Sequence, residues 1–164
     1  MGKLLIFGCT VLLLFACKGN KNQDVGDGSK IDVVSEELPQ VFKVNARAKS
    51  MLEEWPEFNA LETSFNAIYK ADNREDLTFA VEDLLEKEKL LAKSKYPETF
   101  DKSQIKSRQK VVKTFMLKVE AGLDDRTDVM EPMKEMVQAY NAMRNQFNVL
   151  VNNTLDTKLI LDDE

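Results

Sequence analysis

Three methionines recur at every third position near the C-terminal end of this 164-residue chain: Met130, Met133 and Met136. On a helix this spacing places the three thioethers along one stripe, and Met143 continues it two turns later. Soft sulfur ligands suit Cu(I), and a flexible apolar face of this kind also suits a peptide or a lipid tail. Methionine equally fills irregular space inside cores. Core packing is therefore the first interpretation, and a ligand or copper face is the second.

Four lysines, Lys102, Lys106, Lys110 and Lys113, fall within about 80° of one another on a helix that turns about 100° per residue. Like charges three or four residues apart repel, so some compensating feature is expected. One alternative is a contact patch for anionic headgroups or for an acidic partner. The plainer interpretation is a charge match with carboxylates of the preceding segment, namely Glu82, Asp83, Glu86 and Glu88.

Aromatic residues gather around a proline that interrupts an apolar repeat. Trp55 directly precedes Pro56, and Phe58 and Tyr69 follow on the same segment. Proline cannot donate to the helical hydrogen-bond ladder, so the chain is expected to kink or split there. Core packing accounts for these rings, and an exposed aromatic cleft at the kink is the best small-ligand site among the alternatives.

The composition excludes most of the common catalytic and metal-binding chemistries. The chain has no histidine and only two cysteines, which rules out Ser-His-Asp triads, Cys-His pairs, His-ligated haem and zinc sites of the Cys/His type. The sequence has no glycine-rich phosphate loop. A formal net charge of −5 is a poor match for nucleic acid, which selects a basic excess. We expect no enzyme, no metal, no bound cofactor and no nucleic-acid partner.

The first residues have the three parts of a secretory signal. Lys3 precedes the apolar run Leu4–Phe15, which is too short to span a bilayer, since spanning takes about 20 residues. The run closes on Leu14-Phe15-Ala16-Cys17, which resembles the lipobox of bacterial lipoproteins over about residues 1–20. The resemblance implies that residues 1–16 are removed and that Cys17 becomes acylated.

Two details of this resemblance bear on location. Phe15 at the second lipobox position is bulkier than the small residue usual in the family. Lys18, rather than an aspartate, follows the cysteine, which in the family implies sorting to the outer membrane of a double-membraned bacterium. Two or more acyl chains on Cys17 give stable anchoring, at about 0.8 kcal/mol per buried methylene. We expect a cell-envelope protein that its lipid holds at a membrane.

Composition divides the chain into three parts. Residues 1–16 form the signal, and residues 17–35 combine the lipidated cysteine with a flexible polar linker. Residues 36–164 contain one glycine, Gly122, and are rich in helix-forming side chains. Apolar three-four spacing predicts an all-α domain, an antiparallel bundle of about four helices. The predicted helices span residues 36–71 with a kink near Pro56, 73–95, 102–121 and 129–157.

Helix ends and core residues are also predicted. Gly122 is placed to stop the third helix. Capping-box patterns mark three helix starts: Asp72 with Glu75, Asp101 with Gln104, and Asp128 with Glu131. Large aromatic residues favour a globular core over a narrow coiled-coil seam: Trp55, Phe58, Phe65, Phe79 and Phe115.

The sequence favours an interaction role over an enzymatic one. The predicted anchor, the linker and the missing catalytic residues indicate a membrane-anchored module that binds another envelope protein. Two alternatives remain open. The first is a carrier or sensor of an apolar ligand, or less readily of Cu(I), that uses the methionine face. The second is a chaperone-like stress-response bundle with an exposed apolar surface.

Overall fold

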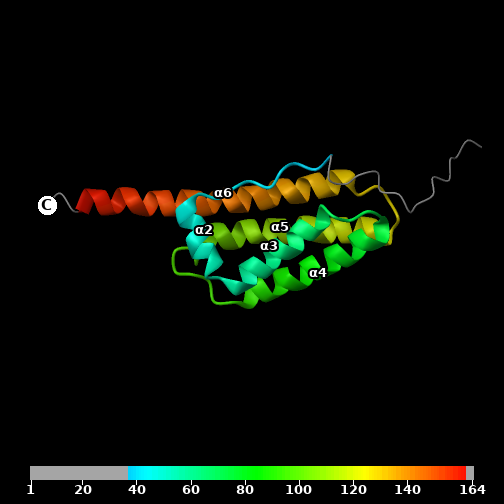
Figure 1. The fold of residues 1–164 in the computed structure, drawn as a ribbon, viewed down its shortest axis with the longest axis horizontal. Helices are drawn as coiled ribbons and strands as arrows, with labels where there is room; N and C mark the ends of the chain where they lie inside the picture. The colour runs from blue at the N-terminus through cyan, green and yellow to red at the C-terminus, as the bar shows by residue number, and fades with distance from the viewer. Residues whose placement is uncertain (1–36, 162–164) are drawn as a thin grey trace, which may run out of the picture.

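The computed structural model describes residues 37–161, with side chains through residue 153. These residues form five helices and no strand: α2 (Ala46–Glu53), α3 (Pro56–Ile68), α4 (Arg74–Lys93), α5 (Ser103–Asp124) and α6 (Met130–Leu161) (Figure 1). The all-α prediction is confirmed over this part of the chain. The predicted signal, the predicted lipidation site Cys17 and the predicted linker lie outside the described residues.

The long helices pack side by side as a helical bundle (Figure 1). α5 contacts both α4 and α6, α3 contacts α4, and the short α2 touches α3 and α6. Rings from α3 meet rings from α6 across the core. Phe65 stacks on Tyr140 with ring centroids 3.9 Å apart, and Phe58 meets Phe147 edge to face at 5.3 Å. The core therefore lies between α3, α4, α5 and α6.

The predicted helix over residues 36–71 is wrong in its first part. Residues 38–45 form no helix and run beside α6 in Figure 1. We call this segment the strap. Asn45 at its end starts α2 by accepting a hydrogen bond from the backbone N of Ala48 at 2.8 Å. An asparagine cap of this kind satisfies a free donor of the first helical turn.

The predicted kink at Pro56 is a full break between two helices. α2 ends at Glu53, and Trp55 has extended backbone angles, φ −110° and ψ 93°. The residue before a proline avoids the helical region, because the proline ring clashes with its backbone. Pro56 is then the first residue of α3, where its missing N–H would have had no helical partner.

Polar side chains of α6 hold the strap. Asn141 Oδ1 accepts from the backbone N of Phe42 at 2.6 Å, and Arg144 Nε donates to the carbonyl of Phe42 at 2.5 Å. One turn further along, Asn148 Oδ1 accepts from the backbone N of Asn45 at 2.8 Å. These three side chains share one face of α6 because they are spaced three and four residues apart. They replace the ladder hydrogen bonds that a helix would have given the strap.

Arg144 also ties the strap to the core. Its side chain is only 8% exposed, forms an ion pair with Glu62 of α3, and donates from Nη1 to the hydroxyl of Tyr140 at 3.3 Å. Burial raises the pKa of Tyr140, so this hydroxyl stays protonated at neutral pH. One guanidinium thus links α6, α3 and the strap.

The observed helix starts differ from the three predicted capping boxes. Asn73, not Asp72, caps α4 and accepts from the backbone N of Asp76 at 2.9 Å. Lys102 occupies the cap position of α5 and makes no side-chain cap hydrogen bond. Asp128 accepts from the backbone N of Met130, the first residue of α6, at 2.9 Å, whereas the predicted box placed this bond at Glu131. Asn73 has the extended backbone angles of a cap residue, φ −151° and ψ 174°, and stands three residues before the N–H that it accepts from.

Gly122 does not stop α5, which continues to Asp124. The chain turns instead at Arg126, whose φ of 54° lies in the left-handed region. Gly122 is required for a different reason, since a Cβ at this position would lie 2.7 Å from Cγ1 of Val129. The glycine lets the start of α6 fold back closely against the end of α5.

Most of the predicted core aromatics are buried, but Phe79 is not. Trp55, Phe58 and Phe65 are at most 2% exposed, whereas Phe79 is 61% exposed. Phe79 stands about 200° around α4 from the buried Leu77, on the opposite face of the helix. The hydrophobicity of Phe79 predicted a buried side chain, but its position around the helix places the side chain on the exposed face of α4.

The Arg144 junction gives a stability prediction. Replacing Arg144 with Met should lower the free energy of unfolding by about 2–4 kcal/mol, because Glu62 and the carbonyl of Phe42 lose a charged partner. The matched control is Lys49→Met, which removes the exposed Lys49–Glu53 pair and should cost less than about 0.5 kcal/mol. Urea unfolding compares the two, and equal effects would contradict the junction's role.

The close approach at Gly122 gives a second stability prediction. Gly122→Ala should destabilise the fold by about 1–2 kcal/mol despite alanine's better helix propensity, because the new methyl overlaps Val129. In a Val129→Ala background the same change should become neutral or stabilising. Thermal melts of the two single variants and the double variant measure this coupling, and simple additivity would rule out the proposed contact.

Candidate functional site

The four methionines singled out from the sequence lie at the core. Met133, Met136 and Met143 are at most 1% exposed, and Met130 is half-buried and packs against the same cluster. Their thioethers fill the space between α6 and its neighbours, which is the packing role weighed first for them. Among residues 37–153, no group of three or more His, Cys, Asp or Glu side chains is placed to hold a metal ion.

The four lysines on α5 fall into two kinds. Lys113 pairs with the buried Glu88 of α4 at 2.9 Å, so one of the four suggested carboxylates does compensate the stripe. Lys106 pairs with Asp101 at 2.5 Å and lies over the Tyr96 ring, 5.2 Å from its centroid. Lys102 and Lys110 are exposed and make no ion pair with any described residue.

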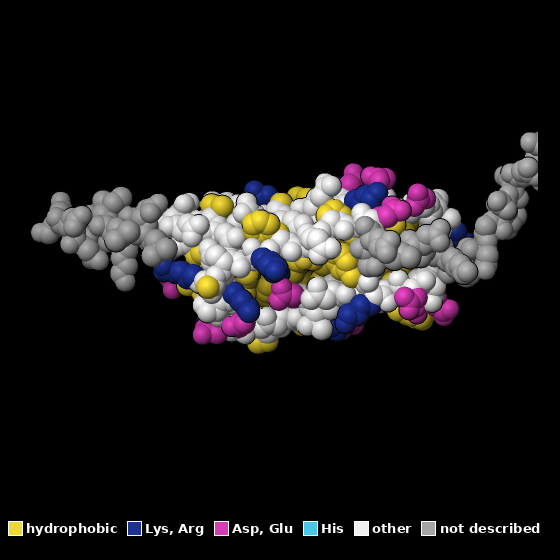
Figure 2. All heavy atoms as spheres, turned by 45° about the horizontal axis from the view of Figure 1, so that its top comes forward, with side chains coloured by type: hydrophobic (Ala, Val, Ile, Leu, Met, Phe, Trp, Pro, Cys, Tyr) yellow, Lys and Arg dark blue, Asp and Glu magenta, His cyan; other side chains and the backbone are white. Residues whose placement is uncertain are grey.

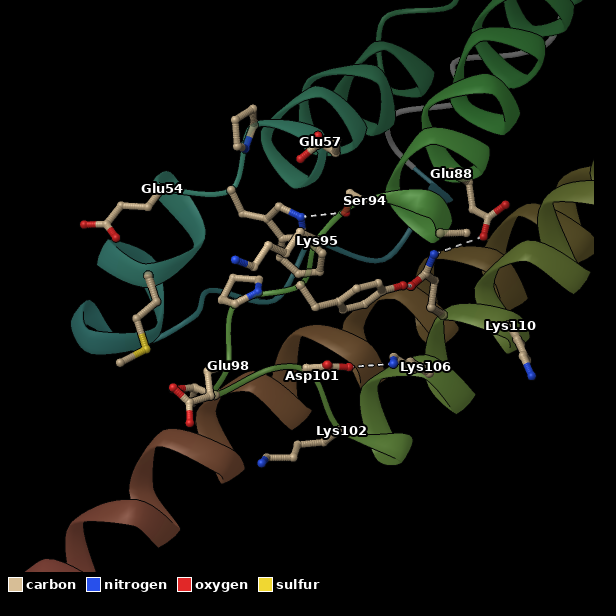
Figure 3. Close-up of a pocket in the computed structure, with 18 residues that line it drawn as sticks. Glu54, Glu57, Glu88, Ser94, Lys95, Glu98, Asp101, Lys102, Lys106 and Lys110 are labelled. Atoms are coloured by element: carbon tan, nitrogen blue, oxygen red, sulfur yellow. Dashed lines mark hydrogen bonds and ion pairs between the residues drawn. The ribbon is translucent and has the colours of Figure 1, made fainter.

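The structure brings three lysines of this stripe, Lys102, Lys106 and Lys110, into one pocket with Trp55. The pocket has a volume of about 1240 Å³ and lies between the break before Pro56, the connection from α4 to α5, and the first turns of α5 (Figure 3). Among its lining residues are Trp55, Tyr96 and four lysines, which are Lys95, Lys102, Lys106 and Lys110. We call it the lysine pocket.

The rings predicted around Pro56 pack at the core, which was the first interpretation, and they do not form an exposed aromatic cleft. Phe58 is 1% exposed and belongs to the core, and Tyr69 faces the strap, where its hydroxyl donates to the carbonyl of Pro39. Tyr96 takes their place beside Trp55, with ring centroids 4.7 Å apart. Sequence spacing could not indicate this pairing, because Tyr96 lies in a connection and not on a helical stripe.

The floor of the lysine pocket is held from α4. Trp55 is 2% exposed, and its indole Nε1 donates to Ser94 Oγ at 2.9 Å. Ser94 in turn donates to the carbonyl of Leu91 at 2.8 Å, at the point where α4 ends. A buried indole N–H needs such a partner, so the end of α4 fixes the position of the ring.

A buried polar chain runs from the pocket into the interface between α4 and α5. The Tyr96 hydroxyl donates to Gln109 Oε1, Gln109 Nε2 donates to Glu88 Oε1 at 3.1 Å, and Glu88 Oε2 meets the Lys113 ammonium at 2.9 Å. Glu88 and Gln109 are 2% and 3% exposed. Burial raises the pKa of Tyr96, which keeps its hydroxyl available as the donor.

A buried role for Gln109 was not predicted from the sequence, although its position on α5 indicates one. It stands four residues after Ile105 and three before Val112, both of which are buried on α5. A polar residue on an apolar stripe must find a partner inside the core. That rule would have marked Gln109 and predicted a polar contact with the neighbouring helix.

Charged side chains of both signs line the rim of the lysine pocket. In Figure 3, Glu54 and Glu57 stand at the break between α2 and α3, while Lys102 and Lys110 stand along α5. Lys95 and Glu98 belong to the connection from α4 to α5. None of these six side chains forms an ion pair with another described residue. The pocket is suited to ion pairing and apolar contact with a ligand that carries both charges.

Comparisons with protein-family models, with curated proteins and with solved structures find no match for this chain. Within residues 37–161, none of the helices combines the length and the apolar character that crossing a bilayer takes.

The polar chain gives a prediction for the pocket. Gln109→Leu should lower the free energy of unfolding by about 1–3 kcal/mol, because the Tyr96 hydroxyl and one Glu88 oxygen lose their partner. Trp55 is the only tryptophan, so its fluorescence reports on the pocket directly. We expect a shifted emission spectrum in the native state together with an earlier urea transition.

The matched control is Gln138→Leu, which replaces an exposed glutamine on α6. It should leave both the emission spectrum and the urea midpoint nearly unchanged. Equal effects of the two substitutions would mean that the buried chain does not hold the pocket in shape.

Proposed function

We propose that this protein is a lipid-anchored envelope lipoprotein that acts as a protein-interaction module. The observation that carries the binding role is the lysine pocket, a large open site with charged side chains that have no partner within the described part of the chain. The anchor rests on the lipobox-like stretch that ends at Cys17. Acyl chains on Cys17 hold the protein at a membrane, and Lys18 favours the outer membrane of a double-membraned bacterium.

The fold supports a binding platform. We treat α3, α4, α5 and α6 as an antiparallel four-helix bundle, with α2 as a short helix across one end. Two elements that meet at that end, the break at Pro56 and the connection from α4 to α5, form the pocket. Both are braced by buried side chains, so the site is largely formed before a partner arrives.

The chemistry of the pocket favours recognition over catalysis. Its ionisable groups are lysines, carboxylates and Tyr96, and the chain has no histidine to act as a general base. We propose no enzymatic activity and no cofactor other than the covalent lipid. The carrier alternative is less well supported, because the methionine face would have to open before it could take a ligand.

Affinity purification tests the proposed function. The lipidated protein, tagged at its C-terminus, should bring down an envelope protein in near-stoichiometric amount from detergent-solubilised native membranes. Cys17→Ser should remove the acyl chains, since serine offers no thiol, and the protein should then leave the detergent phase in a phase-partition assay.

Each half of the proposal can fail separately. A wild-type protein that partitions into the aqueous phase, like Cys17→Ser, would overturn the anchor. A tagged, lipidated protein that is purified alone after mild chemical cross-linking in intact cells would overturn the interaction role.

A further inference from the structure

We infer that the lysine pocket binds an extended segment of a partner protein that is acidic at one end and basic at the other. The acidic end lies along α5, and the basic end lies at the break between α2 and α3. This inference rests on the proposed interaction role and names the chemistry of the partner's binding segment.

The first argument is the separation of charge across the pocket. Figure 3 shows the unpaired Lys102 and Lys110 on the α5 side of the pocket, with Glu54 and Glu57 on the opposite wall. Lys106 is neutralised by Asp101 on its own side, and Lys95 and Glu98 add one charge of each sign on the connection from α4 to α5. A uniformly acidic ligand would meet the lysines favourably but would be repelled at the other wall. A segment with both signs satisfies both walls in one orientation, so charge would also fix its direction.

The second argument is that these charges do not satisfy one another. Elsewhere, opposite charges within reach of each other do pair, as in Lys118–Glu135 at 2.5 Å and Lys87–Asp83 at 3.0 Å. Figure 2 shows side chains of both signs interspersed over one face of the molecule. At the pocket, Lys106 pairs with Asp101 on its own side, whereas Lys102 and Lys110 stand opposite Glu54 and Glu57, and the described residues provide no ion pair between these two walls. A bound segment would bridge them.

The third argument concerns size and the competing ligands. A volume of about 1240 Å³ exceeds the range of roughly 300–1,000 Å³ that is usual for small-molecule sites, and the pocket opens to the surface. Nucleic acid and anionic headgroups of the glycerol or inositol type carry no positive end for Glu54 and Glu57. A peptide segment offers both charges and an apolar middle for the Tyr96 and Pro97 region of the floor.

Variants can reverse each wall without breaking an internal contact. Lys102 and Lys110 have no ion pair within the described residues, and neither do Glu54 and Glu57. Lys102→Glu with Lys110→Glu reverses the α5 wall, and Glu54→Lys with Glu57→Lys reverses the other. The matched control is Lys70→Glu with Lys89→Glu, which changes two exposed, unpaired lysines outside the pocket.

The experiment measures binding of labelled synthetic peptides to the full lipidated protein in detergent micelles by fluorescence anisotropy. One set of peptides has two glutamates at one end, two lysines at the other, and three, five or seven apolar or small residues between them. All-acidic and all-basic peptides of equal length complete the set. The best mixed-charge peptide should bind about tenfold more tightly than either, the change that two ordinary ion pairs provide.

The variants then show whether the charges fix the direction of the bound peptide or only attract it to the pocket. Reversing either wall should weaken the mixed-charge peptide about tenfold, and reversing both should restore binding, because the peptide can lie in the opposite direction. The control variant should bind like wild type. The inference would be overturned if the all-acidic peptide bound as tightly as the mixed-charge peptide. It would also be overturned if no mixed-charge peptide bound at millimolar concentration, or if every variant bound the peptide equally.

Failure here is distinguishable from failure of the proposed function. The same wall-reversal variants, tagged and purified from native membranes, should lose the partner that wild type retains. If they retain it in full, the interaction role stands and the binding segment lies elsewhere on the bundle.

Discussion

The structure depends on one constraint, which is that α6 must satisfy two unlike surfaces at once. Its buried face carries Tyr140 and Phe147, both 0% exposed, which meet rings from α3. Its neighbouring face carries the polar side chains that hold the strap. Arg144 stands where the two faces meet and serves both. If α6 rotated about its axis by one residue, its rings would lose their contacts with α3 and its polar side chains would lose the strap. Both sets of contacts therefore fix the rotation of α6 about its axis.

The geometry of the lysine pocket follows from this packing. Phe58 is held by Phe147 of α6 and lies two residues after Pro56, so the break between α2 and α3 is fixed relative to the core. Trp55 lies against Phe58 with ring centroids 5.8 Å apart, and Tyr96 lies against Trp55. This series of ring contacts fixes the floor of the pocket relative to α6, which explains how a site built largely from connecting segments can have a defined shape.

The helical segments could be predicted from sequence because their signals are local. Three-four spacing marked the long helices, and Pro56 marked the break, since proline acts on its own neighbours. The strap could not be recognised, because Leu38, Val41 and Asn45 also fit a helical spacing. Its stabilising partners on α6 are about a hundred residues away, as the separation of 99 between Phe42 and Asn141 illustrates. The lysine stripe was visible, but its convergence with Trp55 needed the path of the chain between α4 and α5.

The direction of the strap has a mechanical consequence under the proposed anchoring of the protein through Cys17. Glu37 lies near Lys134 at the start of α6, and Asn45 lies near Asn148, so the strap runs parallel to α6 toward the pocket. Tension that enters at residue 37 along the bundle axis therefore acts along the row of hydrogen bonds to α6. Such a load is shear, shared by all the bonds together, whereas a perpendicular pull would peel them one by one. A load applied at the pocket end, as the proposed partner would apply it, therefore acts on the strap in its strongest direction.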